Sequence, residues 1–381
     1  MKRALWTGMG LLMLLTGASV AQSQDGGVIK VAEGDLTVGG YIHLWGTSMQ
    51  DDDYQTVTPD AFAVRRARLI LAGHVVPKVA YRLQEELAGS ASSRDALIKF
   101  EDISLGGKFA VNLTAGQYKY PLSEAGLKWG TPADELIRGP WIYEGGNGAG
   151  STIADRDTGV LIDGAAWNKK IKAYLGLFNG KGTNAAEDND QKDSMLRVMV
   201  SPFEKGSLME GLSFGSGYMK GDQRVKGATT DNQPRERVTF TTKYDKNIGD
   251  GTLSAIGEYF RQKQKPNSAD RLLGWDDAKT TNVYFQLAYK TKLGFLSGED
   301  QALQPVLRYQ KYKTDDGDLV SDELANWKGE MITAGCNLIL NKYSRLMLDY
   351  NRIDDDTWVA GRVEKIDVDN NEFLLQLELK F

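Results

Sequence analysis

The chain has 381 residues, of which 46 are basic and 51 acidic, and this balance gives no sign of a nucleic-acid-binding surface. Its single cysteine, Cys336, excludes an internal disulfide framework, and we expect its side chain to be a small buried one. The 42 glycines and 16 tyrosines are typical of a strand-rich protein.

The first 21 residues have the pattern of a secretory signal peptide. Lys2 and Arg3 form a basic start, Leu5 to Leu15 is mostly apolar, and Ser19-Val20-Ala21 is a small-x-small cleavage site. We expect cleavage before Gln22, with an uncleaved anchor helix as the alternative. The remaining 360 residues carry 44 basic and 51 acidic side chains, a net charge of −7.

No run of 18 apolar residues follows the cleavage site, so we expect no membrane-spanning helix in the rest of the chain. Two classes remain, a soluble exported protein and a transmembrane β-barrel, whose strands alternate apolar and polar side chains. Beyond a short periplasmic segment expected at 22–34, residues 35–381 contain segments of about 8 to 14 residues that alternate in this way. Stretches rich in glycine, asparagine and aspartate separate these segments.

The last segment shows the alternation most clearly. Between Phe373 and Phe381 every odd-numbered residue is apolar, whereas Gln376, Glu378 and Lys380 lie on the other parity. Because successive side chains of a strand point to opposite faces, one face would meet lipid and the other water. The same test predicts an all-β fold of about 16 antiparallel strands, at residues 36–47, 61–75, 78–87, 95–104, 108–119, 158–167, 170–178, 194–202, 212–220, 236–246, 252–263, 281–291, 303–313, 330–340, 345–352 and 371–381.

The connections between these strands alternate in length. Short links, such as 168–169 and 341–344, alternate with longer polar ones at 51–60, 179–193, 224–235, 315–326 and 354–370. Short periplasmic turns and long outer loops are the arrangement of an outer-membrane barrel, and a soluble β-sandwich has no reason to share it. The sequence therefore predicts a transmembrane antiparallel β-barrel with both ends on the periplasmic side.

One connection, residues 121–156, is much longer than the others. A solvated loop would not need its apolar side chains, which are Leu122, Leu127, Trp129, Leu136, Ile137, Trp141 and Ile142. We expect this loop to pack against the barrel wall from inside and to narrow a water-filled lumen. The alternatives are a loop that caps the outer mouth and a subunit contact.

Short motifs, ordered along the chain from about Gly39 to Phe381, carry a resemblance to a known family. They are Arg65-Arg66-Ala67-Arg68-Leu69 with Gly73, Gly116 to Ser123, Arg156 to Val160, Leu177 to Gly180, Tyr284 to Tyr289, Pro305 to Tyr309, and Gly335 to Leu340 with Asp349-Tyr350. In this order they resemble the phosphate-selective porin O and P family. The resemblance implies a 16-stranded homotrimeric porin, set in outer-membrane lipid and lipopolysaccharide, that passes small anions through a basic channel constricted by a loop.

Passage of anions requires cations that face a narrow lumen. In the strand at 61–75, Ala67 and Leu69 mark the lipid parity, so we expect Arg66 and Arg68 to face inward and Arg65 to lie near the outer interface. The full set of pore-lining candidates is Arg66, Arg68, Arg82, Lys99, Arg156, Lys170, Lys172 and Arg308.

The alternative for these cations is a wall network in which they pair with inward acids such as Glu86. Arg156 and Asp157 could also form a structural pair at the base of the long loop.

No cofactor, metal site or nucleic-acid partner is expected. The aspartate clusters at 51–53, 315–316 and 354–356 lack EF-hand spacing, so we expect solvated loops, with divalent-cation bridges to lipopolysaccharide as the alternative. The glycine-rich stretch at 145–152 lacks the lysine of a phosphate-binding loop.

The expected function is therefore passive diffusion of small hydrophilic solutes, including anions such as phosphate, without catalysis. A plugged structural or adhesive barrel is one alternative. An outer-membrane hydrolase is the other, although the chain has only two histidines, His43 and His74, and no H-E-x-x-H motif.

Overall fold

The computed structural model describes residues 28–31, 34–49, 60–106, 109–144, 155–224, 232–266, 272, 276–293, 301–315, 328–358, 365–367 and 371–381. The expected signal peptide, the aspartates at 51–53 and the glycine-rich stretch at 145–152 lie outside these residues. None of the helices in the described part of the chain has the length and apolar character that a membrane-spanning helix needs.

Within the described residues, sixteen antiparallel strands form a barrel and correspond one to one with the sixteen predicted segments. They are β2 (Gly34–Met49), β3 (Ala61–Val76), β4 (Val79–Glu86), β5 (Ser92–Ser104), β6 (Ala110–Lys119), β7 (Arg156–Ala166), β8 (Ile171–Phe178), β9 (Asp193–Val200), β10 (Leu212–Arg224), β11 (Asn232–Ile248), β12 (Gly251–Gln264), β13 (Ala278–Lys292), β14 (Ala302–Asp315), β15 (Lys328–Asn341), β16 (Ser344–Trp358) and β18 (Glu372–Lys380). Two short strands, β1 (Val28–Val31) and β17 (Lys365–Asp367), pair with β2 and β16.

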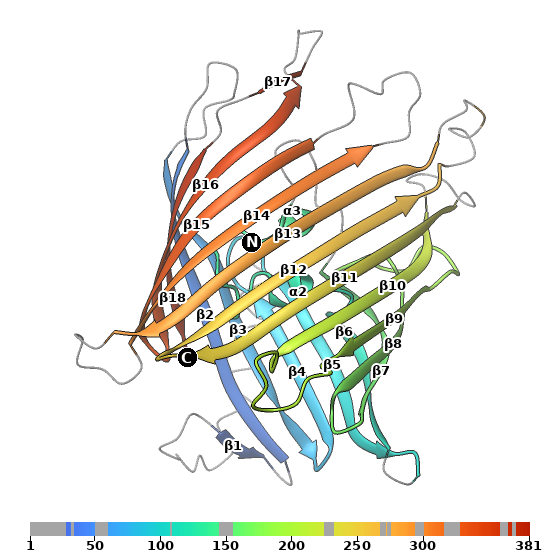
Figure 1. Cartoon of the computed structure of the whole chain (residues 1–381). Coiled ribbons are helices and arrows are strands. Elements are labelled where there is room, and N and C mark those ends of the chain that lie inside the picture. The colour runs from blue at the N-terminus through green and yellow to red at the C-terminus, as the bar shows by residue number, and fades with distance from the viewer. Residues whose placement is uncertain are drawn as a thin grey trace, which may run out of the picture.

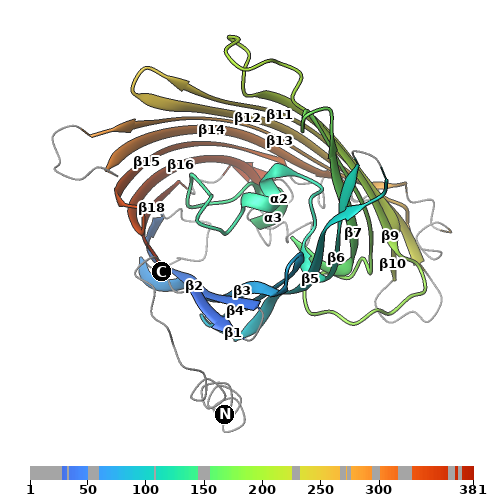
Figure 2. The ribbon, with the colours of Figure 1, turned by 90° about the horizontal axis from the view of Figure 1, so that it is seen from below.

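The sheet closes on itself, because the last strand pairs with the first. β18 and β2 are antiparallel neighbours from Glu372 opposite Met49 to Lys380 opposite Tyr41. Closure leaves no sheet edge in contact with lipid, so the backbone groups of every barrel strand find partners inside the protein. Figures 1 and 2 show the resulting ring of tilted strands.

Side-chain burial follows the predicted parity. In β18, Leu374 and Glu378 are completely buried, whereas Phe373, Leu377 and Leu379 are 43–49% exposed on the outer face. Lipid solvates the apolar outer side chains, and the polar inner ones pair within the lumen. The sixteen barrel strands differ in length, from 8 residues in β4, β8 and β9 to 17 in β11.

The described part of the long connection, residues 121–144, lies inside the ring of strands, and we call it the inserted segment (Figure 2). It contains two short helices, α2 (Glu124–Lys128) and α3 (Trp141–Glu144). Ser123 caps α2 by accepting a hydrogen bond from the N–H of Gly126 at 2.9 Å. The prediction that this connection folds into the lumen is therefore confirmed for residues 121–144, the part before β7 that is described up to Glu144.

The main apolar cluster of the protein joins the inserted segment to the wall. Leu122, Ile142 and Tyr143 of the segment are at most 2% exposed and pack with buried wall residues such as Phe260 and Tyr312. Burial of apolar surface holds the segment on the wall, which explains why this loop is so rich in apolar residues.

Candidate functional site

The inserted segment is hydrogen-bonded to strands of the wall other than β6 and β7, the two strands that it connects. The carbonyl of Leu122 accepts a hydrogen bond from the Thr239 hydroxyl of β11 at 2.7 Å. Farther along, the N–H of Ile137 donates to Asp349 of β16 at 2.6 Å. Since buried backbone groups must be paired, these bonds fix the path of the segment as well as its position.

Arg308 of β14, one of the predicted pore-lining residues, also binds the inserted segment. Its side chain is almost fully buried, and Nη2 donates to the carbonyls of Arg138 at 2.7 Å and Gly139 at 3.4 Å. The structure therefore places the Arg308 guanidinium against the backbone of the inserted segment.

The inserted segment meets the near wall at Gly130. The Gly130 carbonyl accepts hydrogen bonds from the Tyr41 hydroxyl at 2.8 Å and from Nη1 of Arg68 at 3.0 Å. Arg68 also pairs with Glu86 at 2.8 Å. Arg66 lies beside the same glycine, since a Cβ at this position would come within 2.8 Å of its Nη2. Both arginines face inward and are nearly fully buried under the segment.

Replacing Gly130 with alanine is expected to loosen this contact. The glycine has a φ of 69°, which disfavours a side chain, and the added Cβ would collide with Arg66. We expect the free energy of unfolding to fall by about 1–3 kcal/mol in a urea titration followed by tryptophan fluorescence. Gly89→Ala is the matched control, because Gly89 has a φ of 64° but open space around it. An equal loss in both variants would mean that the contact with Arg66 contributes nothing.

An ion-pair cluster lies where the connection enters β7. Arg156 is 1% exposed, and its guanidinium contacts Asp155 and, at 2.7 Å, Asp95 of β5. Lys119 lies 3.4 Å from the same Asp155 carboxylate. Burial opposes a charge on Asp155, but Lys119 and Arg156 outweigh it and hold the pKa of this carboxyl below its ordinary value. Asp157, the alternative partner of Arg156, instead accepts two backbone N–H groups.

A cavity of about 350 Å³ opens beside this cluster, between the inserted segment and β4 to β7, and we call it the wall cavity. Within it, the side-chain nitrogen of Gln84 and the hydroxyl of Tyr118 are buried without a hydrogen-bond partner among the described residues. Both groups can donate. Four cations and two carboxylates also line the cavity, namely Arg82, Lys99, Lys119 and Arg156 with Asp95 and Asp163. Lys119 and Arg156 also pair with Asp155, and Lys99 with Glu101, so these two acids outside the lining offset part of its positive charge. The two unused donors and the exposed cations of the lining suit an anion.

Arg82 and Lys99 are the most accessible of the predicted cations in the wall cavity. Arg82 pairs with Asp95 at 2.9 Å, yet 40% of its side chain stays exposed. Lys99 pairs with Glu101 at 3.4 Å and keeps 33% exposed. The exposed parts of both side chains can therefore contact a solute in the cavity while these ion pairs stay formed.

Two predicted cations lie apart from the wall cavity. Lys170 is in the turn between β7 and β8, where it pairs with Glu204 of the next turn. Lys172 follows near the same end of β8 and is exposed. The structure thus brings Arg82, Lys99 and Arg156 together and leaves these two lysines at the rim.

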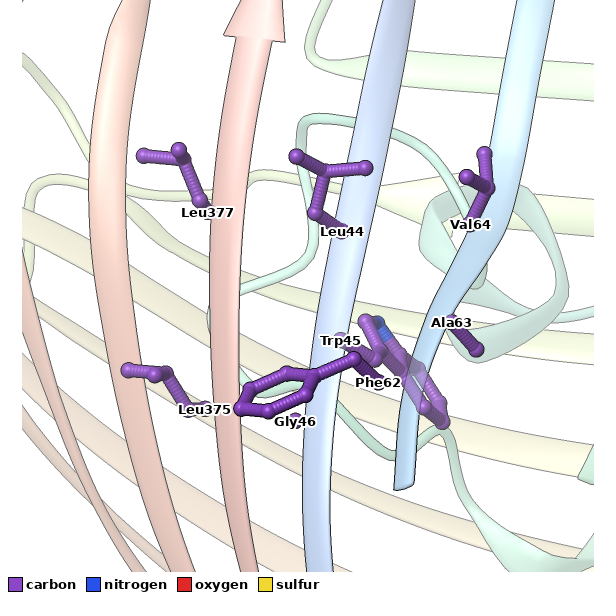
Figure 3. A pocket seen from close by; sticks show the side chains of 8 residues that line it. All are labelled: Leu44, Trp45, Gly46, Phe62, Ala63, Val64, Leu375 and Leu377. Atoms are coloured by element: carbon purple, nitrogen blue, oxygen red, sulfur yellow. The ribbon is translucent and has the colours of Figure 1, made fainter.

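A β-bulge changes the direction of the Arg65 side chain from the one that strand parity predicts. The register of β2 against β3 shifts between His43 and Leu44, so Arg65 is an extra residue in β3. Its guanidinium lies 5.1 Å from the centroid of the Trp45 ring, whose side chain is buried on the inner face. Arg65 is therefore directed to the lumen. Figure 3 shows the apolar groove beside the bulge, with the exposed side chains of Leu44, Phe62, Val64 and Leu377 and the half-buried side chain of Leu375.

Comparisons with known proteins agree with this architecture. An anion-selective porin from Comamonas acidovorans has a TM-score of 0.59 at 16% identity, over 92% of this chain and 100% of that one. The outer-membrane channel DcaP of Acinetobacter baumannii has a TM-score of 0.60 at 14% identity, over 93% and 100%. OmpT of Vibrio cholerae in its trimer form has a TM-score of 0.56 at 14% identity, over 91% and 99%. At these identities the likeness shows the fold alone.

A search of curated proteins finds no match. The profile of the phosphate-selective porin O and P family, however, matches residues 37–381, which is most of the chain. The predicted resemblance is confirmed: the chain belongs to the phosphate-selective porin O and P family and is an outer-membrane porin.

Proposed function

We propose that the porin passes small hydrophilic anions, phosphate among them, by passive diffusion past the wall cavity. The observation that carries this proposal is the lining of that cavity, in which four cations outnumber two carboxylates and two donors are unused. A low-dielectric wall strengthens the field of such charges on an ion nearby. The structurally similar porin from Comamonas acidovorans is described as anion-selective, which supports the proposed passage of anions.

The acidic composition of the chain does not oppose this proposal. At physiological salt the field of an exposed charge is screened within about 8 Å, so distant outer-loop acids act weakly on an ion in the lumen. Selectivity then depends on the groups that line the narrow part of the path.

The test is the reversal potential of the purified protein in a planar bilayer with a potassium chloride gradient. We expect the potential to lie on the chloride side, and added phosphate to reduce the chloride current. A potential on the potassium side would contradict anion selectivity.

The same measurement separates a channel from a plugged barrel. The broad contact of the inserted segment with the wall favours plugging as the second candidate. A plugged barrel would give no stable current steps, whereas an open porin gives them.

The proposed function involves no catalysis. Gly211 to Gly215 does fit G-x-S-x-G, but Ser213 lies near the start of β10, which pairs with β9 and β11 as an antiparallel strand. A hydrolase elbow needs a turn from a strand into a helix. The Ser213 hydroxyl also lies within hydrogen-bonding distance of a backbone carbonyl of β11, at 3.5 Å.

The proposal includes export and assembly. We propose that residues 1–21 are removed and that three copies form the working unit, as in the Vibrio cholerae structure described as a trimer. N-terminal sequencing of the membrane-purified protein tests the first point. The mass of the detergent-solubilised particle, measured by light scattering, tests the second.

A further inference from the structure

The outer face of the barrel carries a row of cations along the neighbouring strands β12 to β15, on the side that Figure 1 presents. They lie near the extracellular ends of these strands, opposite the short turns. Their side chains have the parity of the lipid-facing residues of their strands, such as Val283 and Leu307, which are 43% and 54% exposed. We call them the basic strip, and its members are Arg261, Lys263, Lys279, Lys311, Lys313 and Lys328.

The basic strip begins where the outward apolar band ends. Moving toward the extracellular end, the last apolar or aromatic residues on this face are Tyr259 in β12, Val283 in β13 and Tyr309 in β14. Tyr259 lies opposite Val283, but Val283 lies opposite Lys311, so the border steps by two residues between β13 and β14. Tilted strands that cross a flat membrane surface need such a step. The strip therefore lies at the level where lipid headgroups begin.

The strip is only partly neutralised by nearby acids. Three of its cations form ion pairs, Lys263 with Asp277 at 2.6 Å, Lys279 with Asp315 at 3.9 Å and Lys311 with Glu330. Arg261 and Lys313 are exposed and make no ion pair with any residue in the described part of the chain. These two cations are therefore available to a negatively charged partner at the membrane surface.

Arg261 and Lys313 lie on either side of one hydroxyl group. Thr281 of β13 is opposite Arg261 of β12 on one side and opposite Lys313 of β14 on the other. Neighbouring strands are about 4.8 Å apart, so the Cα atoms of the two cations are roughly 10 Å apart, and both long side chains can reach a group above Thr281. A guanidinium binds two phosphate oxygens at once, and an ammonium and a hydroxyl can bind the others.

The opposite side of the barrel lacks such a group of cations. In β8 and β9, the outward pair at the same end is Leu177 with Ser194, and Leu177 is 55% exposed. Cations at this level are therefore not a general feature of the rim. They accompany the strands whose outer faces combine a tall apolar band with aromatic rings, such as the stacked pair Phe240 and Tyr259, whose centroids are 6.2 Å apart.

We propose that Arg261, Thr281 and Lys313 bind a phosphate group of lipopolysaccharide, the phosphorylated glycolipid of the outer leaflet. The acyl chains of the same molecule would lie on the apolar band below, over Phe240 and Tyr259. Charge-assisted hydrogen bonds to the phosphate and burial of apolar surface by the chains then act together. A free phosphate ion would gain only the first of these.

The test measures how much lipid A with both of its phosphates is retained by the immobilised, detergent-solubilised protein as the lipid concentration rises. The variant is the double substitution Arg261→Gln, Lys313→Gln. The matched control is Lys169→Gln, Lys205→Gln, which removes the same charge from exposed turns at the periplasmic end. Heat-modifiable migration on SDS gels verifies that each barrel is folded.

We expect the double variant to raise the half-saturating concentration of lipid A about tenfold, which corresponds to about 1.4 kcal/mol, and the control to leave it unchanged. Dephosphorylated lipid A should bind the wild type as weakly as it binds the double variant. Inorganic phosphate at the same concentrations should not displace lipid A from the wild type.

Four results would overturn the site. They are equal affinity of lipid A for the wild type and the double variant, an equal loss in the control, tight binding of dephosphorylated lipid A, and displacement by inorganic phosphate. The site is independent of the proposed passage of anions, because both cations lie outside the lumen. The double variant should therefore keep the wild-type reversal potential, and a shifted potential would overturn the assignment of Arg261 and Lys313 to the lipid-facing surface.

Discussion

Replacing Arg156 with alanine is expected to remove most of the anion preference and to destabilise the barrel. Arg156 neutralises two buried carboxylates, Asp95 and Asp155, and loss of one member of a buried ion pair costs about 3–5 kcal/mol. The wall cavity also loses one of its four cations while both of its carboxylates remain. We expect the anion-to-cation permeability ratio to fall about tenfold, equivalent to about 1.4 kcal/mol of ion stabilisation.

Reversal potentials and urea titrations of the same preparations measure both effects. Arg156→Lys should keep the charge, and thus most of the selectivity, while losing stability because an ammonium cannot reproduce the two-sided contact. Lys192→Ala is a control for charge removal, as its ion pair with Glu187 is exposed in an outer loop. A wild-type reversal potential in Arg156→Ala would remove the ion-pair cluster from the selectivity mechanism.

Replacing residues 124–142 with a short glycine–serine linker is expected to raise the single-channel conductance severalfold. The strands close the barrel by their own pairing, and the inserted segment occupies the lumen they enclose. A barrel of this size is wide enough to hold an aqueous channel once that segment is gone. We also expect weaker anion preference, because ions would no longer pass close to the basic wall.

Conductance steps in a planar bilayer give the result directly. Insertion of the same linker at Gly89, an outer-loop glycine with open space around it, serves as the control and should leave the steps unchanged. If the linker variant conducted like the wild type, the current could not be limited at the level of the inserted segment.

The barrel was predictable because each of its strands separates lipid from water. Because alternate side chains face lipid and water, apolar and polar residues alternate along each strand. The segment predicted at 61–75, for example, is strand β3 (Ala61–Val76) in the structure. The apolar residues of the long connection likewise indicated packing inside the lumen. These are local patterns, and each can be read within a few tens of residues.

The site was less predictable, since its geometry depends on contacts between distant parts of the chain. Parity directs Arg68 inward, but nothing local shows that Gly130, 62 residues away, covers it. The bulge that turns Arg65 toward the lumen has no sequence marker, and parity placed this residue near the outer interface. A polar cavity at the short-turn end of the barrel is lined by five strands and the inserted segment, so no local motif could have predicted that Lys290 and Lys380 lie near each other.

The unequal strands also set how the protein fits its bilayer. Eight residues inclined at 45° rise only about 19 Å, short of the apolar band of about 25 Å that such barrels expose. Beside β4, β8 and β9 the membrane would have to become thinner, at a cost that grows with each ångström of mismatch. Three copies that met along the side of short strands, β4 to β9, would shield that side from lipid. The side of long strands around β11 would span the full thickness of the apolar layer of the membrane.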